Sequence, residues 1–82
     1  MLSRDEVYTR LAYYLTEMFE VPAEDIRPDA KLYEDLGLDS IDAVDLLVKL
    51  QEITSRKISP AVFKKVRTVD DVVNQVCVLL DA

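Results

Sequence analysis

The sequence predicts an all-α fold: a small four-helix bundle with a long loop between helices 1 and 2 and a short third helix. Three segments place apolar residues at three- and four-residue spacing, which gives each segment an apolar helix face. Residues that favour helix starts precede these segments and a shorter fourth one. Because half of the 82 residues are apolar and 32% are charged, residues 1–82 are expected to form one domain around one core.

The first predicted helix begins after Ser3. Ser3 and Glu6 have the spacing of a capping box, in which each side chain satisfies a backbone N–H group of the first turn. Pro22 marks the approximate end of this helix. The apolar face contains Val7, Leu11, Leu15, Met18 and Phe19.

The chain between Val21 and Leu38 has no helical period and is interrupted by Pro22, Pro28 and Gly37. A connection of this length is usually either functional or disordered. We expect this one to be held across the bundle by its apolar residues, which are Ile26, Leu32, Tyr33, Leu36 and Leu38.

The second helix is predicted to start at Asp39 or Ser40, which are both good N-caps, and to end near Ser55. Asp42 and Asp45 would place negative charge near the positive end of its dipole. Its apolar residues form two adjoining stripes, which is more than one packing face requires. The first stripe contains Ala43, Leu46, Leu47, Leu50 and Ile53, and the second contains Ile41, Val44 and Val48.

Two further helices are predicted in the C-terminal part. The pair Ser-Pro at residues 59–60 offers an N-cap and an N1 proline for a short helix through Phe63 to about Val66. Thr68 and Asp71 resemble another capping box at the start of the final helix. Valines favour strands, but the final segment lacks two-residue alternation, so we predict a helix there. Its apolar residues are Val69, Val72, Val73, Val76, Leu79 and Leu80.

The net charge of −6 arises in the first half of the chain: residues 1–40 hold four basic and ten acidic residues, whereas residues 41–82 hold six of each. An acidic chain disfavours nucleic acid and anionic lipid as partners. The sequence contains no apolar run long enough for a membrane span and no secretory signal. Cys77 cannot form an internal disulfide, so a cytoplasmic location is expected. We also expect a monomer.

The stretch LYEDLGLDSID, residues 32–42, surrounds Ser40 with acidic residues. A serine nucleophile needs a base within hydrogen-bond reach, but the chain has no histidine, and Lys49 lies nine residues further along the same predicted helix. One cysteine without histidine cannot form a zinc site, and the acids do not follow the order of a calcium-binding loop. We therefore predict no catalytic residue, no resident metal and no enzymatic activity.

Ser40 can instead be the substrate of another protein's active site. A hydroxyl in the first turn of a helix, after a loop that contains glycine, is accessible to a second protein. The unpaired N–H groups and the dipole at that turn would favour a phosphate ester by about 0.3–1 kcal/mol. The local chemistry also allows a plainer interpretation, in which Asp39 and Ser40 only cap the helix.

The motif D-S-I-D at residues 39–42, preceded by E-D-L-G-L, resembles the attachment motif of acyl carrier proteins, in which the serine after the aspartate carries 4′-phosphopantetheine. The resemblance continues through V-D-L-L-V-K-L-Q-E in the second predicted helix and T-V-D-D at the start of the last. The D-S form is more similar to fatty-acid and polyketide carriers than to peptidyl carriers. The resemblance implies that acyl intermediates of fatty-acid, polyketide or related biosynthesis travel as thioesters on an arm derived from coenzyme A.

The resemblance also implies roles for polar residues around the motif. Ser40 would be the attachment site, and Asp39 would contact the metal and the modifying enzyme during transfer. Asp42 and Asp45 would pair with basic residues of partner enzymes. The implied partners are a phosphopantetheinyl transferase (holo-carrier synthase) and acyl-loading and chain-elongating enzymes such as ketosynthases.

Apolar residues receive roles from the same resemblance. Ile41 and Val48 would be exposed contacts for partners. Phe63 and Val66 would lie near the mouth of an acyl cavity, where partners could also contact them. The residues expected to line either the core or this cavity are Leu46, Leu47 and Leu50.

Two segments depart from the family pattern. Many carriers are acidic where this chain reads Q-E-I-T-S-R-K and F-K-K-V-R. Charge complementarity mainly sets partner choice and encounter rate, so we hypothesise a specialised carrier that serves a restricted set of enzymes. Phe63 stands where a smaller residue is common and would reshape the acyl pocket. The alternative function is an unmodified helical interaction module that binds a partner through the second helix.

Overall fold

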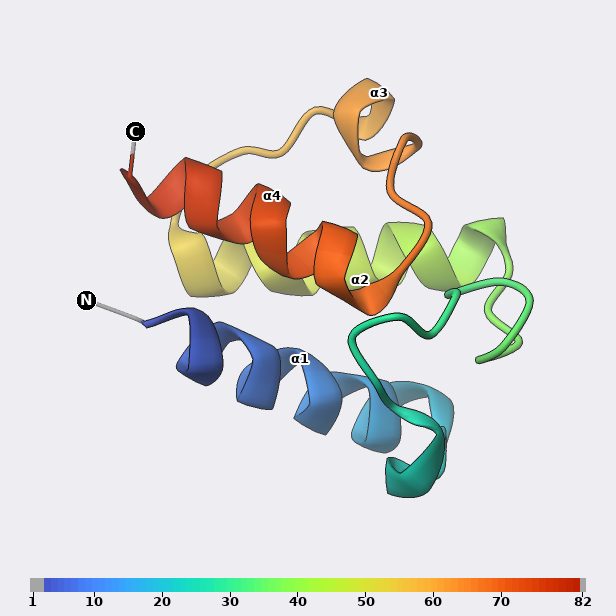
Figure 1. Cartoon of the computed structure of the whole chain (residues 1–82). Helices are drawn as coiled ribbons and strands as arrows, with labels where there is room; N and C mark the ends of the chain where they lie inside the picture. Colours follow the sequence, from blue (N-terminus) through green and yellow to red (C-terminus); the bar gives the residue numbers. More distant parts are fainter. Residues whose placement is uncertain (1–2, 82) are drawn as a thin grey trace.

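The computed structural model describes residues 3–81, and this part of the chain is helical. The elements are α1 (Arg4–Phe19), the short 3₁₀ helix η1 (Ala23–Asp25), α2 (Ser40–Thr54), α3 (Pro60–Phe63) and α4 (Val69–Asp81). α4 packs against both α1 and α2, while α3 packs against α2 and stands above it in Figure 1. The all-α prediction is confirmed: three long helices are joined by a much shorter α3. Within residues 3–81, the sole β pairing is an isolated bridge between Lys31 and Thr68.

Both capping boxes predicted from the sequence are present. At the start of α1, the Glu6 backbone N–H donates to Ser3 Oγ at 3.2 Å, and the Ser3 N–H donates to Glu6 Oε1 at 3.4 Å. Before α4, the Asp71 N–H donates to Thr68 Oγ1 and the Thr68 N–H to Asp71 Oδ2, both at 3.1 Å. These bonds satisfy N–H groups that have no partner inside the helix and so fix where each helix begins.

Helix α1 ends as predicted, just before Pro22. Glu20 adopts a left-handed conformation with φ 58°, and its N–H donates to Thr16 O at 3.0 Å. The Val21 N–H then donates to Leu15 O at 3.2 Å, so the last carbonyl groups of the helix are satisfied by the turn itself. Val21 is buried, and this anchors the start of the long loop.

The loop between α1 and α2 is ordered against the beginning of α4. The Leu32 N–H donates to Arg67 O at 2.9 Å, and the Val69 N–H donates to Ala30 O at 3.0 Å. A third bond joins the Asp70 N–H to Pro28 O at 2.9 Å. The loop is therefore an ordered segment that is held by backbone hydrogen bonds to residues 67–70, and not a disordered connection.

The apolar anchors of the loop behave differently from one another. Ile26, Leu32 and Leu38 are buried, as predicted, and Leu36 is partly buried. Tyr33 is 45% exposed, so the prediction that it packs across the bundle is wrong. The reason is that the chain turns over residues 32–36, so Tyr33 does not continue along the buried side of the loop on which Leu32 lies.

Gly37 closes this turn with φ 72°. An added Cβ would meet no atom within 4 Å, so glycine is required by the backbone conformation and not by lack of space. The Leu38 N–H donates to Leu32 O at 3.1 Å, which brings the chain back to the entrance of α2. Gly37 therefore positions the first residues of that helix.

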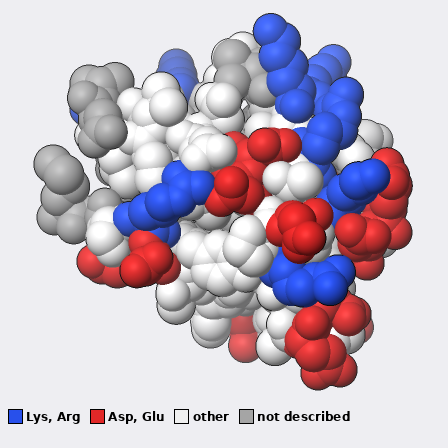
Figure 2. Space-filling model, viewed as in Figure 1, with Lys and Arg blue, Asp and Glu red and all other residues white. Residues whose placement is uncertain are grey.

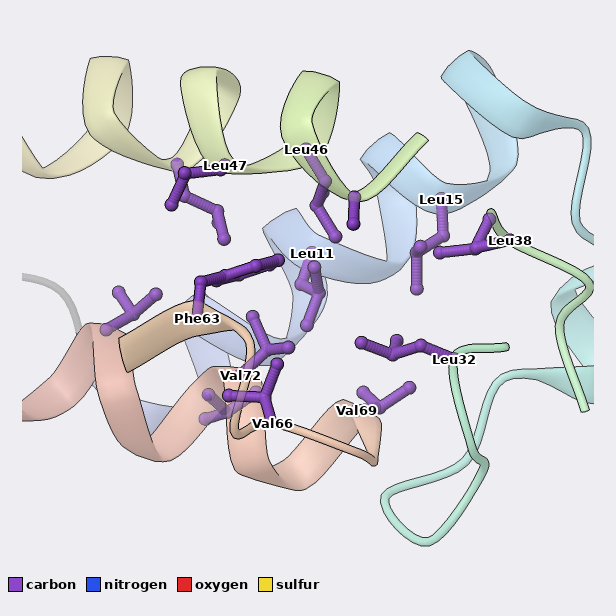
Figure 3. Packing of buried hydrophobic residues seen from close by; sticks show 14 of the residues in the cluster. Leu11, Leu15, Leu32, Leu38, Leu46, Leu47, Phe63, Val66, Val69 and Val72 are labelled. Atoms are coloured by element: carbon purple, nitrogen blue, oxygen red, sulfur yellow. The ribbon is translucent and has the colours of Figure 1, made fainter. Parts of the chain in front are cut away.

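One core joins all of these elements. Figure 3 shows leucines of α1, α2 and the loop converging with Phe63, Val66 and the valines of α4. Cys77 packs against this core and is partly buried. The largest fully buried side chains are Leu11, Leu15, Leu46, Leu50, Val69, Val72, Val73 and Val76. None of the described helices has the length and apolar character that a membrane crossing requires.

Helix α3 is shorter than predicted, because it ends at Phe63 and not at Val66. The Val66 N–H donates to Phe63 O at 3.1 Å and closes a turn over residues 64–65. The chain must turn here because Arg67 and Thr68 pair with the loop immediately afterwards. The turn buries both Phe63 and Val66.

Candidate functional site

Ser40 is the first residue of α2, directly after the N-cap Asp39. Its side chain is exposed, and its hydroxyl makes no hydrogen bond to any residue from 3 to 81. The entrance of the helix is fixed by the residues on either side of it, so the serine itself has no structural task. The hydroxyl is therefore accessible to a second protein.

Asp39 and Asp42 cap this helix reciprocally. The Asp42 N–H donates to Asp39 Oδ1 at 2.8 Å, while the Asp39 N–H donates to Asp42 Oδ2 at 3.3 Å. Within the described chain, the N–H groups of Ser40 and Ile41 have no protein acceptor. Such groups, at the positive end of a helix dipole, can donate to the oxygens of an attached phosphate.

A cavity of about 120 Å³ opens beside Ser40. Its walls come from α2, from α3 with the following turn, and from the loop before α2. The lining residues are Tyr33, Ser40, Ala43, Val44, Leu47, Phe63 and Lys64. Most of these side chains are apolar, whereas those of Ser40, Tyr33 and Lys64 carry polar groups. The arrangement places an exposed hydroxyl next to a small, mostly apolar cavity, which we call the Ser40 pocket.

The second apolar stripe of α2 is exposed, as its surplus in the sequence suggested. Ile41 is 71% exposed, Val44 57% and Val48 49%. Asp45 is exposed beside them, whereas Asp42 is half-buried and engaged in the helix cap. Exposed apolar side chains grouped on one helix face mark a candidate surface for a protein partner.

Phe63 and Val66 are buried and do not belong to the exposed face of α2. They are 6% and 5% exposed, and Phe63 lines the Ser40 pocket whereas Val66 does not. Figure 3 shows Phe63 pointing from α3 into the core shared with Leu47 and Val72. A partner could therefore contact Phe63 or Val66 only if the α3 region moved. Leu47 lines the pocket, but Leu46 and Leu50, at 0% and 1% exposed, belong to the core.

Basic side chains gather next to the pocket. Lys64, Lys65 and Arg67 are exposed in the turn after α3, and Figure 2 shows blue side chains along the upper edge of this face, near that turn. Arg67 bonds back to the turn, with its Nη1 donating to Lys64 O at 2.7 Å. Lys64 thus brings one end of the basic segment to the Ser40 pocket, whereas Lys65 and Arg67 do not line it.

The pocket was only partly predictable. Ala43, Val44 and Leu47 follow Ser40 at helical spacing, so their place beside it could have been found from the sequence. Tyr33 and Lys64 reach the same cavity through the loop and the α3 turn, and no local pattern predicts that. In residues 3–81, no group of three or more metal-binding side chains lies together.

Comparison with known proteins connects this site to a family. Residues 10–76 match the family model described as a phosphopantetheine attachment site. "Acyl carrier protein 2" of Ralstonia nicotianae is 47% identical over 81 residues, which cover 99% of this chain and 100% of that protein. "Acyl carrier protein" of Thermotoga maritima is 33% identical over 76 residues, covering 93% of this chain and 94% of that protein.

A third relative extends the comparison to another organism. "Acyl carrier protein" of Saccharopolyspora erythraea is 34% identical over 71 residues, covering 87% of this chain and 75% of that protein. The family match includes both Ser40 and the pocket beside it. The chain belongs to the acyl carrier proteins, which carry a 4′-phosphopantetheine group and act as carriers and not as enzymes.

Proposed function

We propose that Ser40 bears the 4′-phosphopantetheine group and that this chain carries acyl intermediates as thioesters on the thiol of that arm. The observation that carries the proposal is an exposed, unbonded hydroxyl on the first residue of α2, beside an apolar pocket. The surrounding donors fit the group, because the N–H groups of Ser40 and Ile41 face no protein acceptor within residues 3–81. Related fatty-acid or polyketide chemistry would supply the acyl groups.

Attachment requires a second protein. The Ser40 Oγ–P bond forms while the phosphoanhydride bond of coenzyme A breaks, and adenosine 3′,5′-bisphosphate leaves. The serine proton must pass to a base on the phosphopantetheinyl transferase, since this chain has no histidine. Asp39, next to the reacting hydroxyl, is the residue proposed to contact the transferase and its metal.

The Ser40 pocket is the proposed site for the first part of a bound acyl chain. Its volume of about 120 Å³ admits a short apolar segment, and entry of a longer chain would require its walls to separate. The wall proposed to separate on loading is α3 with its turn, since α3 is only four residues long; in the unloaded structure it packs against α2. We count α3 as the fourth helix of the bundle, and the bundle would open where α3 meets α2.

The exposed face of α2 is the proposed docking surface for the transferase and for acyl-loading and elongating enzymes. Ile41 and Val48 would supply apolar contacts, while Asp42 and Asp45 would pair with basic partner residues. The exposed basic residues Lys64 and Lys65 would restrict the set of enzymes that fit. A monomer in the cytoplasm is the simplest setting for these encounters.

Loading with an acyl group tests this function. The purified chain, given coenzyme A, magnesium and a broad-specificity transferase, should gain one arm and then accept an acyl group from a loading enzyme. Hydroxylamine at neutral pH should release the acyl group, because it cleaves thioesters. A chain that gains no arm beside a control carrier that does would favour the unmodified interaction module.

A further inference from the structure

Lys64 is the one basic residue among those that line the Ser40 pocket. Its side chain is exposed, and no carboxylate of residues 3–81 lies within ion-pair distance of its ammonium group. Lys31 and Lys49 differ in this respect, because each has a glutamate partner at 3.3 Å. Lys64 therefore presents a charge at the pocket rim that the described protein does not neutralise.

The backbone of Lys64 is held in place while its ammonium group is not. Lys64 O accepts from Arg67 Nη1 at 2.7 Å, and the Val66 N–H bonds to Phe63 O across the turn. Burial of Phe63 anchors the same segment in the core. Because the backbone is anchored and the four-carbon side chain is flexible, the ammonium group can reach a group at the mouth of the pocket.

The chemistry at Ser40 calls for such a charge. The stretch around it contains Glu34, Asp35, Asp39 and Asp42, so a phosphodiester there would join an acidic neighbourhood. Exposed charges separated by less than about 10 Å are only partly screened at 0.1 M salt. A cation that lines the same small cavity would offset this repulsion and donate hydrogen bonds to the phosphate oxygens.

We propose that the Lys64 ammonium group is the internal counterion of the phosphodiester at Ser40 across the mouth of the Ser40 pocket. The proposal rests on attachment at Ser40. It makes Lys64 a positioning residue for the arm: the contact would tie the α3 turn to the start of α2 only after modification. Arm attachment would then stabilise the fold, and this gain would weaken as salt screens the pair.

Lys65 provides the matched control. It is the next residue, equally basic and exposed, but it does not line the pocket. If Lys64 served only as a docking charge for partner enzymes, the isolated protein would not distinguish the two lysines. Properties of the purified apo and holo forms therefore separate the two roles without any partner present.

The experiment compares wild type, Lys64→Gln, Lys65→Gln and Lys64→Arg, each in apo form and in fully modified form verified by intact mass. Thermal unfolding gives the holo-minus-apo shift of the midpoint at low and high salt, and ³¹P NMR reports the phosphodiester. We expect a positive shift that high salt reduces, that Lys64→Gln diminishes, and that Lys65→Gln and Lys64→Arg retain. The ³¹P resonance should move in Lys64→Gln but not in Lys65→Gln.

Equal shifts and equal ³¹P positions in Lys64→Gln and Lys65→Gln would overturn the role of Lys64 while leaving Ser40 modification intact. Failure of every variant, including wild type, to gain the mass of the arm would instead overturn the proposed function. The two failures are therefore distinguishable in one set of samples.

Discussion

Asp39 and Asp42 exchange hydrogen bonds between their side chains and backbone N–H groups at the start of α2, at 2.8 and 3.3 Å. This pair encloses Ser40 without bonding to its hydroxyl. The acids beside the serine therefore have a structural task that is separate from any contact with a transferase. That separation allows the capping role of Asp39 and its proposed contact with the transferase to be measured independently.

Asp39→Ala should lower the free energy of unfolding by about 0.5–2 kcal/mol, because the N-cap is lost. Asp39→Asn should leave stability nearly unchanged, since asparagine caps equally well, but it removes the charge. Chemical denaturation measures the first effect and the rate of arm transfer the second. Slow transfer in both variants would assign Asp39 a direct role with the transferase, whereas normal transfer in Asp39→Asn would contradict it.

Ile41→Ala and Val48→Ala should change the free energy of unfolding by no more than about 0.5 kcal/mol, because both side chains are exposed. Each should nevertheless slow transfer and acyl loading, since apolar contacts with partner enzymes are lost. Val78→Ala is the matched control, as Val78 is 62% exposed on α4. Rates lowered equally by all three substitutions would argue against a docking surface on α2.

Phe63→Ala should destabilise the unloaded protein by about 3–5 kcal/mol and enlarge the Ser40 pocket. A bound acyl chain should recover part of this loss, and the recovery should grow with chain length more steeply than in wild type. Thermal unfolding of carriers loaded with acyl groups of increasing length measures the effect. Val72→Ala, which removes core volume away from the pocket, should show no such steeper dependence.

The pKa of Asp71 is lowered because its carboxylate accepts backbone N–H bonds from Arg67 and Thr68, with burial acting in the opposite direction. A lowered folded-state pKa stabilises the protein above the ordinary aspartate value of about 3.9, and this contribution is lost as pH falls through the folded-state pKa. Asp71→Asn should cost about 1 kcal/mol at neutral pH and make stability less dependent on acid. Chemical denaturation from neutral to acidic pH measures the free energy of unfolding of both proteins. If this free energy changes with pH in the same way in Asp71→Asn and in wild type, the role of Asp71 is refuted.

Local signals in the sequence were sufficient to predict the long helices. The capping boxes at Ser3 and Thr68 and the apolar period of each segment act within a few residues, so they predict helix starts and buried faces. The reciprocal cap at α2 was not foreseen because its third residue is Asp42, where the usual motif has glutamate or glutamine.

Features that depend on distant residues could not be predicted. The bridge between Lys31 and Thr68 orders the loop and ends α3 early, and its partners are far apart in the sequence. The same applies to Tyr33 and Lys64, which meet at the Ser40 pocket only after the chain has folded. The motif predicts Ser40 as the attachment site, whereas the shape of its surroundings could be described only from the structure.

Intact-mass measurement after incubation with coenzyme A, magnesium and a phosphopantetheinyl transferase shows whether Ser40 is the attachment site. Wild type and Ser59→Ala should each gain the mass of a single arm, and Ser40→Ala should gain none while remaining folded. An arm on Ser40→Ala, or an unmodified wild type alongside a fully modified control carrier, would contradict the account.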